Sequence, residues 1–243
     1  MSANRKRVLV FQHLDVEHPG VFRDFLAEDG IDYVPVALDV GEEIPPLAGF
    51  DALWVMGGPM DVWQEAEHPW LLPEQAAIRE AVRERRLPFL GFCLGHQLLA
   101  AALGGRVGPA AEPEVGIMAV ERCESAAGSP FLQGVPASCQ VLQWHSAEVL
   151  ALPPGAQALL RSPRCAVQAM SVGEHAFSMQ FHVEITAETV PQWHAIPEYR
   201  QALERSLGVS GAQTLQASAR DHLADFNALA RRFYDNWRSA CGW

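Results

Sequence analysis

The chain has 243 residues, of which 49% are apolar, and its formal net charge is −11. This length suits one large domain or two small ones, with enough apolar residues for a sizeable core. An acidic chain without a basic cluster is not typical of nucleic-acid or anionic-membrane binding, and no apolar run approaches the ~20 residues of a membrane span.

The cysteines and the N-terminal apolar run indicate the cellular compartment. The cysteines are Cys93, Cys123, Cys139, Cys165 and Cys241. Their wide spacings and the lack of a Cys-x-x-Cys pair argue against a disulfide framework or a metal site, and we expect no cofactor. The apolar stretch at 8–11 is short and typical of a first strand, not of a signal peptide. These features predict a cytoplasmic protein.

Apolar, β-rich runs alternate with helical patterns over the first hundred residues. Strands are predicted over 7–14, 31–38, 52–56 and 87–92, and helices over 19–29, 72–86 and 94–103. Strands that are apolar on both faces and separated by helices indicate a parallel sheet covered on two sides.

The middle of the chain has short strand-like runs separated by Pro and Gly. They cover 115–122, 139–149, 156–161, 166–172 and 175–181, and they indicate a mixed or antiparallel extension of the sheet. Helices return from Thr186 onward, with a polar break near 208–213. We therefore predict an α/β fold, a flavodoxin-like three-layer sandwich with a mainly parallel central sheet, an antiparallel extension and a helical C-terminal appendage.

One cysteine stands between two glycines at a predicted strand-to-helix junction, in the stretch Gly91-Phe92-Cys93-Leu94-Gly95. A sharp turn of this kind lifts a nucleophile clear of a sheet, and small neighbours let the turn pack tightly. The N-terminus of a helix favours the thiolate, and the N–H of Leu94 would point to where an oxyanion forms. The alternative is a buried structural cysteine in a glycine-punctuated turn.

A thiolate enzyme needs a base, and Phe181-His182-Val183-Glu184 supplies a candidate after the last predicted strand. Residues two apart on an extended segment face the same way, so His182 and Glu184 would project together. The carboxylate could then orient the imidazole in a Cys-His-acid triad. The alternatives are a surface pair on an edge strand or two metal ligands, although no third ligand stands nearby.

GFCLGHQ and FHVE together resemble the nucleophile elbow and the distal H-x-E of class I glutamine amidotransferases. Three further stretches resemble that family: Met56-Gly57-Gly58-Pro59 its glycine-rich oxyanion loop, Glu114-Val115-Gly116 its E-x-G, and Gln143-Trp144-His145-Ser146 its W-H-G-D segment. The resemblance runs from about Arg7 to Thr186, and it is strongest for stand-alone members related to the amidotransferase domain of GMP synthase. It implies a domain over 1–186 with a helical extension over 187–243.

The resemblance also implies a role for each matching residue. Cys93 would attack the γ-carbonyl of glutamine, His182 would act as general base and then acid, and Glu184 would orient His182. The N–H groups of Gly58 and Leu94 would form the oxyanion hole. Gln97, Trp144 and His145 would bind substrate; Gln97 lies one helical turn beyond Cys93 and can face the same pocket.

The chain departs from the family pattern at a few positions. Val183 replaces the usual Pro of H-P-E, and Ser146 and Ala147 replace Gly and Asp of W-H-G-D. These changes raise the question whether free glutamine is the substrate. His96 lies beside the elbow, and we expect it to face solvent or a partner.

Several functions are compatible with these motifs. One is a glutamine hydrolase that delivers ammonia to a synthase subunit; another is a free-standing γ-glutamyl hydrolase that acts on a small conjugate. Further alternatives are a cysteine peptidase on a similar fold and a catalytically silent regulatory subunit. The aromatic residues of the C-terminal helices would belong to the core, cover the sheet edge or form a homodimer contact.

Overall fold

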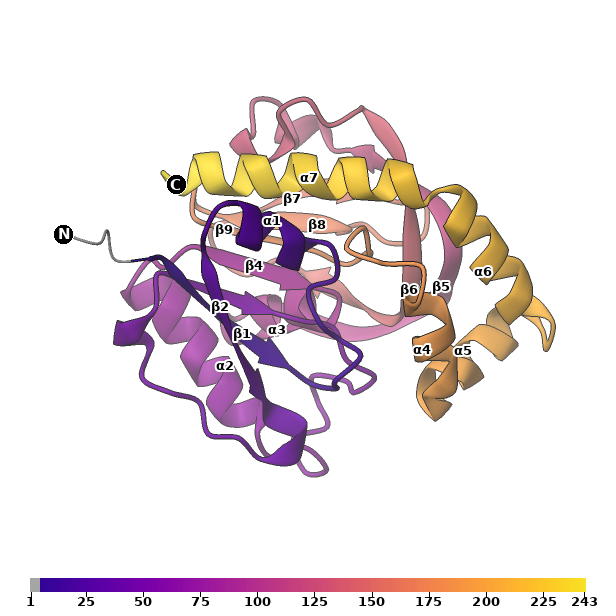
Figure 1. Cartoon of the computed structure of the whole chain (residues 1–243), viewed down its shortest axis with the longest axis horizontal. Helices are drawn as coiled ribbons and strands as arrows, with labels where there is room; N and C mark the ends of the chain where they lie inside the picture. Colours follow the sequence, from indigo (N-terminus) through magenta and orange to yellow (C-terminus); the bar gives the residue numbers. More distant parts are fainter. Residues whose placement is uncertain (1–4) are drawn as a thin grey trace.

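A computed structural model of the chain describes residues 5–243, and within them the strands form a nine-stranded sheet (Figure 1). The strands are β1 Arg7–Gln12, β2 Asp32–Ala37, β3 Ala52–Val55, β4 Phe89–Phe92, β5 Arg106–Arg122, β6 Ser138–Ala151, β7 Ala156–Arg161, β8 Ala169–Val172 and β9 Ala176–Met179. Their order in the sheet is β2-β1-β3-β4-β9-β8-β7-β5-β6. The first five of these pair in parallel and the rest are antiparallel, so the prediction of a parallel core with an antiparallel extension is confirmed.

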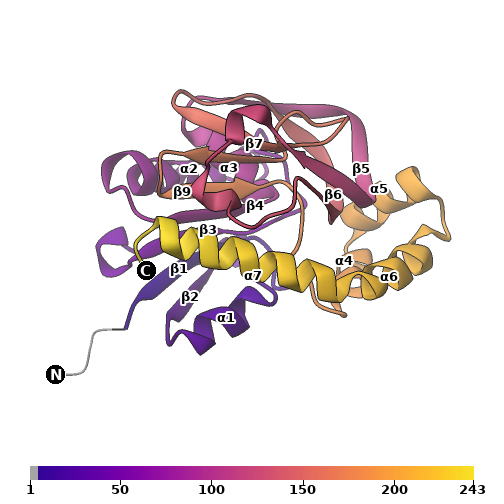
Figure 2. The ribbon, with the colours of Figure 1, turned by 90° about the horizontal axis from the view of Figure 1, so that it is seen from above.

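Helices cover both faces of the parallel core. They are α1 Phe22–Glu28, α2 Leu71–Arg79, α3 Leu94–Ala102, α4 Thr189–Ala195, α5 Pro197–Leu207, α6 Gly211–Asp221 and α7 Leu223–Ala240. Figure 2 shows α2 and α3 on one face of the sheet and α1 and α7 on the other. Strands β3, β4 and β9 are buried along their whole length. Such strands need apolar residues on both faces, which is why the sequence shows continuous apolar runs there.

The long helix α7 supplies much of the second layer. Its aromatic side chains Phe226, Phe233, Tyr234 and Trp237 are buried. The Trp237 ring meets Trp54 of β3 edge to face, with ring centroids 5.4 Å apart. Its indole Nε1 donates a hydrogen bond of 3.0 Å to the carbonyl of Phe89. These aromatic residues therefore belong to the core, as one of the three readings of the sequence predicts.

The helices α4, α5 and α6 lie beside the β5–β6 end of the sheet (Figure 1). They share a hydrophobic cluster with β5 and β6, in which Trp144, Trp193 and Tyr199 contact one another. This packing holds α5 close to the carboxyl end of the parallel strands. The division into 1–186 and 187–243 stays a prediction, and its first four residues lie outside the described part of the chain.

The structure differs from the predicted elements mainly at their ends. The first antiparallel strand begins at Arg106, not at 115, because Gly108, Pro109 and Pro113 weaken the strand pattern without preventing a pairing that shifts register between Pro109 and Glu114. The predicted helix over 72–86 becomes α2 followed by a π-helical turn at Glu80–Glu84. No helix within residues 5–243 is long and apolar enough to cross a membrane.

Candidate active site

Cys93 stands at the junction of β4 and α3, where it forms the N-cap of the helix. Its backbone has φ 48° and ψ −102°, a conformation that non-glycine residues rarely adopt. The Cys93 N–H donates to the carbonyl of Met179 over 2.8 Å, which fixes the strained turn against β9. Strain of this kind persists where the surrounding structure over-determines it, as it does at nucleophile elbows.

The two flanking glycines are required by close packing. A Cβ on Gly95 would lie 2.1 Å from the carbonyl oxygen of Val55, and a Cβ on Gly91 would lie 2.8 Å from that of Gly95. The Gly95 N–H donates to the carbonyl of Met56 over 3.1 Å. The helix α3 therefore lies directly against the end of β3, so the sulfur of Cys93 emerges above the sheet.

His182 and Glu184 project together, as their spacing predicts. His182 Nδ1 and Glu184 Oε1 are 2.6 Å apart, and both side chains are buried. The backbone of His182 forms two hydrogen bonds with Leu142 of β6, of 2.8 and 3.3 Å. The edge of the Trp193 indole lies against the imidazole, with ring centroids 4.5 Å apart. The imidazole is thus held from the sheet, from α4 and from its own carboxylate partner.

Val183 adds a contact that the family's proline could not make. The Val183 N–H donates a 2.9 Å hydrogen bond to Oε2 of Glu184, while Oε1 of the same carboxylate meets His182. Proline has no N–H to donate at this position. The departure from H-P-E therefore leaves the His182–Glu184 geometry intact and gives the second carboxylate oxygen a partner.

Electrostatic contacts favour a charged His182. Burial lowers the pKa of the imidazole, but the Glu184 carboxylate and the adjacent Cys93 raise it well above the ordinary value of 6.5. The imidazolium form is therefore stabilised next to the sulfur. An imidazolium beside a cysteine at a helix N-terminus is the setting in which a thiolate is stabilised.

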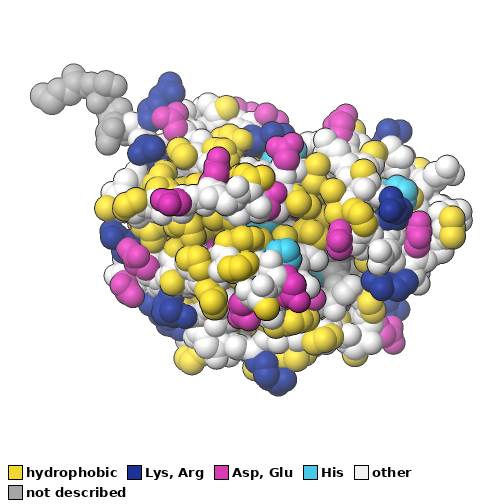
Figure 3. All heavy atoms as spheres, turned by 90° about the horizontal axis from the view of Figure 1, so that it is seen from below, with side chains coloured by type: hydrophobic (Ala, Val, Ile, Leu, Met, Phe, Trp, Pro, Cys, Tyr) yellow, Lys and Arg dark blue, Asp and Glu magenta, His cyan; other side chains and the backbone are white. Residues whose placement is uncertain are grey.

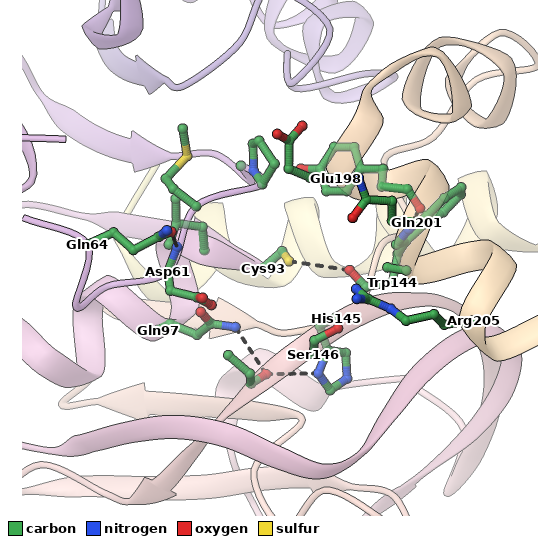
Figure 4. A pocket seen from close by; sticks show the side chains of 17 residues that line it. Asp61, Gln64, Cys93, Gln97, Trp144, His145, Ser146, Glu198, Gln201 and Arg205 are labelled. Carbon is green, nitrogen blue, oxygen red and sulfur yellow. Dashed lines mark hydrogen bonds between the residues drawn. The ribbon is translucent and has the colours of Figure 1, made fainter. Parts of the chain in front are cut away.

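A pocket of about 290 Å³ opens above the sulfur of Cys93. Figure 4 shows Cys93 in its centre, with Gln97 and Asp61 on one side and Glu198, Gln201 and Arg205 from α5 on the other. Figure 3 shows the molecular surface hollowed between the body that contains the sheet and the C-terminal helices. Burial raises the pKa of the Asp61 carboxyl. The pocket wall therefore combines groups from the predicted family domain with groups from the C-terminal helices.

Gln97 faces the pocket, as its helical spacing predicts, and it connects two other polar groups. Its Nε2 lies 3.1 Å from Oε1 of Gln180 and 3.2 Å from the carbonyl of Ala147. Gln180 in turn donates from Nε2 to the sulfur of Cys93 over 3.5 Å. We did not predict this role for Gln180, although it stands two residues before His182 and alternation places it on the same side of the segment.

Glu17 is a second buried carboxylate that the sequence did not reveal. Its Oε1 accepts a hydrogen bond from the hydroxyl of Tyr199 on α5. Burial raises the pKa of Glu17, while the nearby His182 lowers it. This contact joins the loop after β1 to α5 beside the His182–Glu184 pair.

Gly58, Leu94, Trp144 and His145 all line the pocket. The carbonyl of Trp144 lies 4.0 Å from the Cys93 sulfur, whereas its indole packs away from the pocket and donates to the carbonyl of Tyr199. The ring nitrogens of His145 meet Ala147 O at 2.9 Å and Glu114 Oε2 at 3.1 Å. Because both nitrogens have protein partners, a substrate contact at this segment would come from its backbone. The substrate-binding roles of these residues stay predictions.

The expectation for His96 is wrong. Its side chain is fully buried, with Nδ1 2.9 Å from Ser178 Oγ and Nε2 3.1 Å from the carbonyl of Val167. Burial lowers its pKa to about 3, so the ring is neutral. It joins α3 to β9 and the preceding loop. The strongly apolar helix α3 is buried on nearly all sides, so no face was left for a solvent-exposed histidine.

The other cysteines have surroundings that disfavour the thiolate. Burial raises the pKa of Cys139 to about 11 and that of Cys241 to about 12, and it also raises the pKa values of Cys123 and Cys165. Within residues 5–243, no three or more His, Cys, Asp or Glu side chains are grouped so as to hold a metal ion.

The fold and this arrangement agree with the similarity of the chain to known proteins. A family model described as glutamine amidotransferase class-I matches residues 26–193. The chain therefore belongs to the class I glutamine amidotransferase family.

Relatives share this assignment over different lengths. The chain is 33% identical over 151 residues to a glutamine-hydrolyzing GMP synthase subunit of Sulfolobus acidocaldarius, which covers 62% of this chain and 76% of that protein. It is 31% identical over 188 residues to the glutamine amidotransferase-like protein YfeJ of Salmonella typhimurium, covering 76% and 78%. A 40% identity to the GMP synthase of Thermomicrobium roseum spans 53% of this chain but only 22% of that longer protein.

Solved structures match nearly the whole chain. A glutamine amidotransferase of Thermotoga maritima superposes with a TM-score of 0.85 at 27% identity, covering 97% of this chain and 99% of that one. A glutamine amido transferase of Methylobacillus flagellatus gives a TM-score of 0.84 at 29% identity, covering 98% and 96%. The similarity to these structures therefore includes the C-terminal helices α4–α7.

Proposed function

We propose that the protein is a cysteine-dependent hydrolase of γ-glutamyl amides, with glutamine as the first candidate substrate. The observation that carries this proposal is the 2.6 Å His182–Glu184 contact beside a cysteine held at a strained helix N-cap. Membership in a family named for glutamine-dependent amide transfer supports the choice of substrate.

In this mechanism the sulfur of Cys93 attacks the γ-carbonyl carbon, and the carbonyl oxygen becomes an oxyanion. The N–H groups of Gly58 and Leu94 donate hydrogen bonds to that oxyanion; the N–H of Leu94 lies in the first helical turn, where backbone donors have no intrahelical partner. His182 gives its proton to the leaving nitrogen, so ammonia departs and a γ-glutamyl thioester remains. His182 then takes a proton from water, which attacks the thioester and releases glutamate.

A second candidate substrate is a γ-glutamyl conjugate larger than glutamine. A neighbouring hollow of about 320 Å³ shares Ser146, Ala202 and Arg205 with the Cys93 pocket, and Arg164 also lines it. This adjoining space and its two guanidinium groups favour a conjugate whose distal end is anionic. The protein would then use water as acceptor without a synthase subunit.

A substrate panel tests the proposal. Glutamine, glutathione and γ-glutamyl amines are incubated with the purified protein alone, and release of ammonia or amine is measured. We expect turnover of at least one compound, loss of turnover in Cys93→Ala, and retained turnover in Cys139→Ala, a matched variant at a cysteine outside the pocket.

The outcomes separate the alternatives. Turnover of conjugates by the protein alone supports the free-standing hydrolase. Glutaminase activity that requires an added synthase subunit supports the ammonia-delivering role. Equal activity of Cys93→Ala and the wild type in every assay would favour a catalytically silent regulatory protein.

A further inference from the structure

His13 has a position in the fold that the mechanism above does not use. It follows β1 directly, and its side chain is fully buried. Its Nδ1 lies 2.7 Å from the carbonyl oxygen of Gly57, and its Nε2 lies 2.9 Å from Oε1 of Glu74 on α2. The Trp70 indole stacks on the ring, with centroids 5.2 Å apart and planes 15° apart. Four segments of the chain therefore meet at this imidazole.

The two contacts of the ring define its donor pattern. A carbonyl oxygen and a carboxylate both accept hydrogen bonds, so both ring nitrogens must carry hydrogen for the two bonds to form together. Burial lowers the pKa of His13, but the Glu74 carboxylate outweighs that effect and raises it above 6.5. The imidazole is thus a charged donor aimed at the backbone of Gly57, and charge-assisted bonds of this kind are the stronger ones.

The Gly57 carbonyl belongs to the same peptide unit as the N–H of Gly58. No peptide bond of the described residues is cis, so the carbonyl and the N–H of this unit point in opposite directions. Holding the carbonyl toward His13 therefore turns the N–H away from His13. Gly58 lines the pocket above Cys93, where an oxyanion donor is needed.

The packing around Gly58 leaves little room for another arrangement. A Cβ on Gly58 would lie 2.9 Å from Leu94 Cδ2, 3.0 Å from His13 Cβ and 2.7 Å from Met60 Sδ. Two successive glycines give the peptide unit wide conformational freedom. That freedom must be removed by an external contact if the N–H is to be preorganised, and His13 supplies the contact.

We propose that His13, held by Glu74, is a positioning residue that orients the Gly57–Gly58 peptide so that the Gly58 N–H serves as an oxyanion donor. The inference rests on the proposed function, because an oxyanion forms only if Cys93 attacks a carbonyl. It assigns His13 a role in the transition state without any contact between its side chain and substrate.

Two variants with different donors test the inference. His13→Leu removes the donor at similar volume, whereas His13→Asn places an amide nitrogen near the position of Nδ1. We expect His13→Leu to lower kcat on the best substrate of the panel roughly 10- to 100-fold with KM changed by less than about three-fold, because an oxyanion donor acts only in the transition state. His13→Asn should recover most of that loss.

Alkylation of Cys93 by iodoacetamide supplies a readout that separates positioning from general damage. This reaction is a displacement at carbon that forms no oxyanion, so its rate should be the same in His13→Leu and the wild type. A crystal structure of His13→Leu should also show that the Gly57–Gly58 peptide has lost its single orientation.

Three results would overturn the inference: an unchanged kcat in His13→Leu, a parallel fall of kcat and alkylation rate, or an unchanged peptide orientation in the crystal. Failure of the proposed function would look different, since the wild type would then turn over no γ-glutamyl compound. The crystallographic comparison would still decide whether His13 orients the peptide.

Discussion

At the scale of single residues, the site depends on one carboxylate that satisfies two donors. Glu184 meets His182 through Oε1 and the Val183 N–H through Oε2, so its orientation is fixed from both sides. The backbone carbonyl of Glu184 also accepts a 2.9 Å hydrogen bond from the N–H of Val21. The segment from His182 to Glu184 is therefore anchored to the loop that precedes α1.

The substitution Glu184→Gln tests the role of this carboxylate. In the wild type the pKa of His182 is raised, so the stabilisation from the charged pair is fully present below pH 6.5 and is lost as the pH rises through the higher folded-state pKa. With glutamine in place of glutamate, burial dominates, and NMR titration should show the pKa of His182 below 6.5. We expect turnover to fall by about 10²-fold or more. A pKa of His182 that is unchanged in the variant would contradict this account.

Gly20 tests how closely the loop packs on that segment. It has φ +53°, and a Cβ there would lie 1.8 Å from the carbonyl oxygen of Glu184. Gly30 has φ +65° but no heavy atom within 4 Å of its would-be Cβ, so Gly30→Ala is a matched control for the backbone conformation alone.

Gly30→Ala should cost about 1–2 kcal/mol of unfolding free energy, and Gly20→Ala should cost more, about 3 kcal/mol or above, and should also reduce activity. Urea unfolding of both variants measures the difference. Equal losses would show that the contact with Glu184 does not constrain the loop.

At the scale of elements, the sequence predicted the order of strands and helices, the elbow and the partnership of His182 with Glu184. These features depend on local patterns: apolar runs, glycines at fixed offsets and alternation along an extended segment. The burial of His96 and the roles of Gln180 and His13 depend on which elements meet in space. A single sequence carries no direct signal for such contacts, which is why these residues were misjudged or missed.

The early start of β5 was missed for a different reason. Its first residues include Gly108, Pro109 and Pro113, which lower strand propensity. Pairing with β6 over a long edge overrides that preference, with a change of register where the prolines interrupt the ladder. Tertiary context decided this element, whereas local propensity decided β1 to β4.

The packing of α7 on the sheet can be measured with one tryptophan. Trp237 is fully buried against Trp54 and donates to the carbonyl of Phe89, so Trp237→Ala should lower the free energy of unfolding by about 3–5 kcal/mol. Trp243→Ala, at a partly buried tryptophan near the C-terminus, should cost clearly less. Thermal or chemical unfolding compares the two, and similar losses would mean that α7 is not an integral layer of the core.

At the scale of the whole molecule, the C-terminal helices contribute both to the core and to the site. Helix α7 forms part of one layer of the sandwich, while α5 forms one wall of the pocket above Cys93. The hydrogen bond from Tyr199 to Glu17 joins that wall to the loop after β1. Substrate choice is therefore expected to depend on α5 as well as on the motifs that identify the family.

The central claim is that Cys93 is the nucleophile for a glutamyl substrate. Intact-mass spectrometry after incubation with 6-diazo-5-oxo-L-norleucine, a glutamine-like electrophile, tests it most directly. The account predicts one adduct per chain, located on Cys93 by peptide mapping, retained in Cys139→Ala and absent from Cys93→Ala. An unmodified wild-type protein, or an adduct that persists in Cys93→Ala, would contradict it.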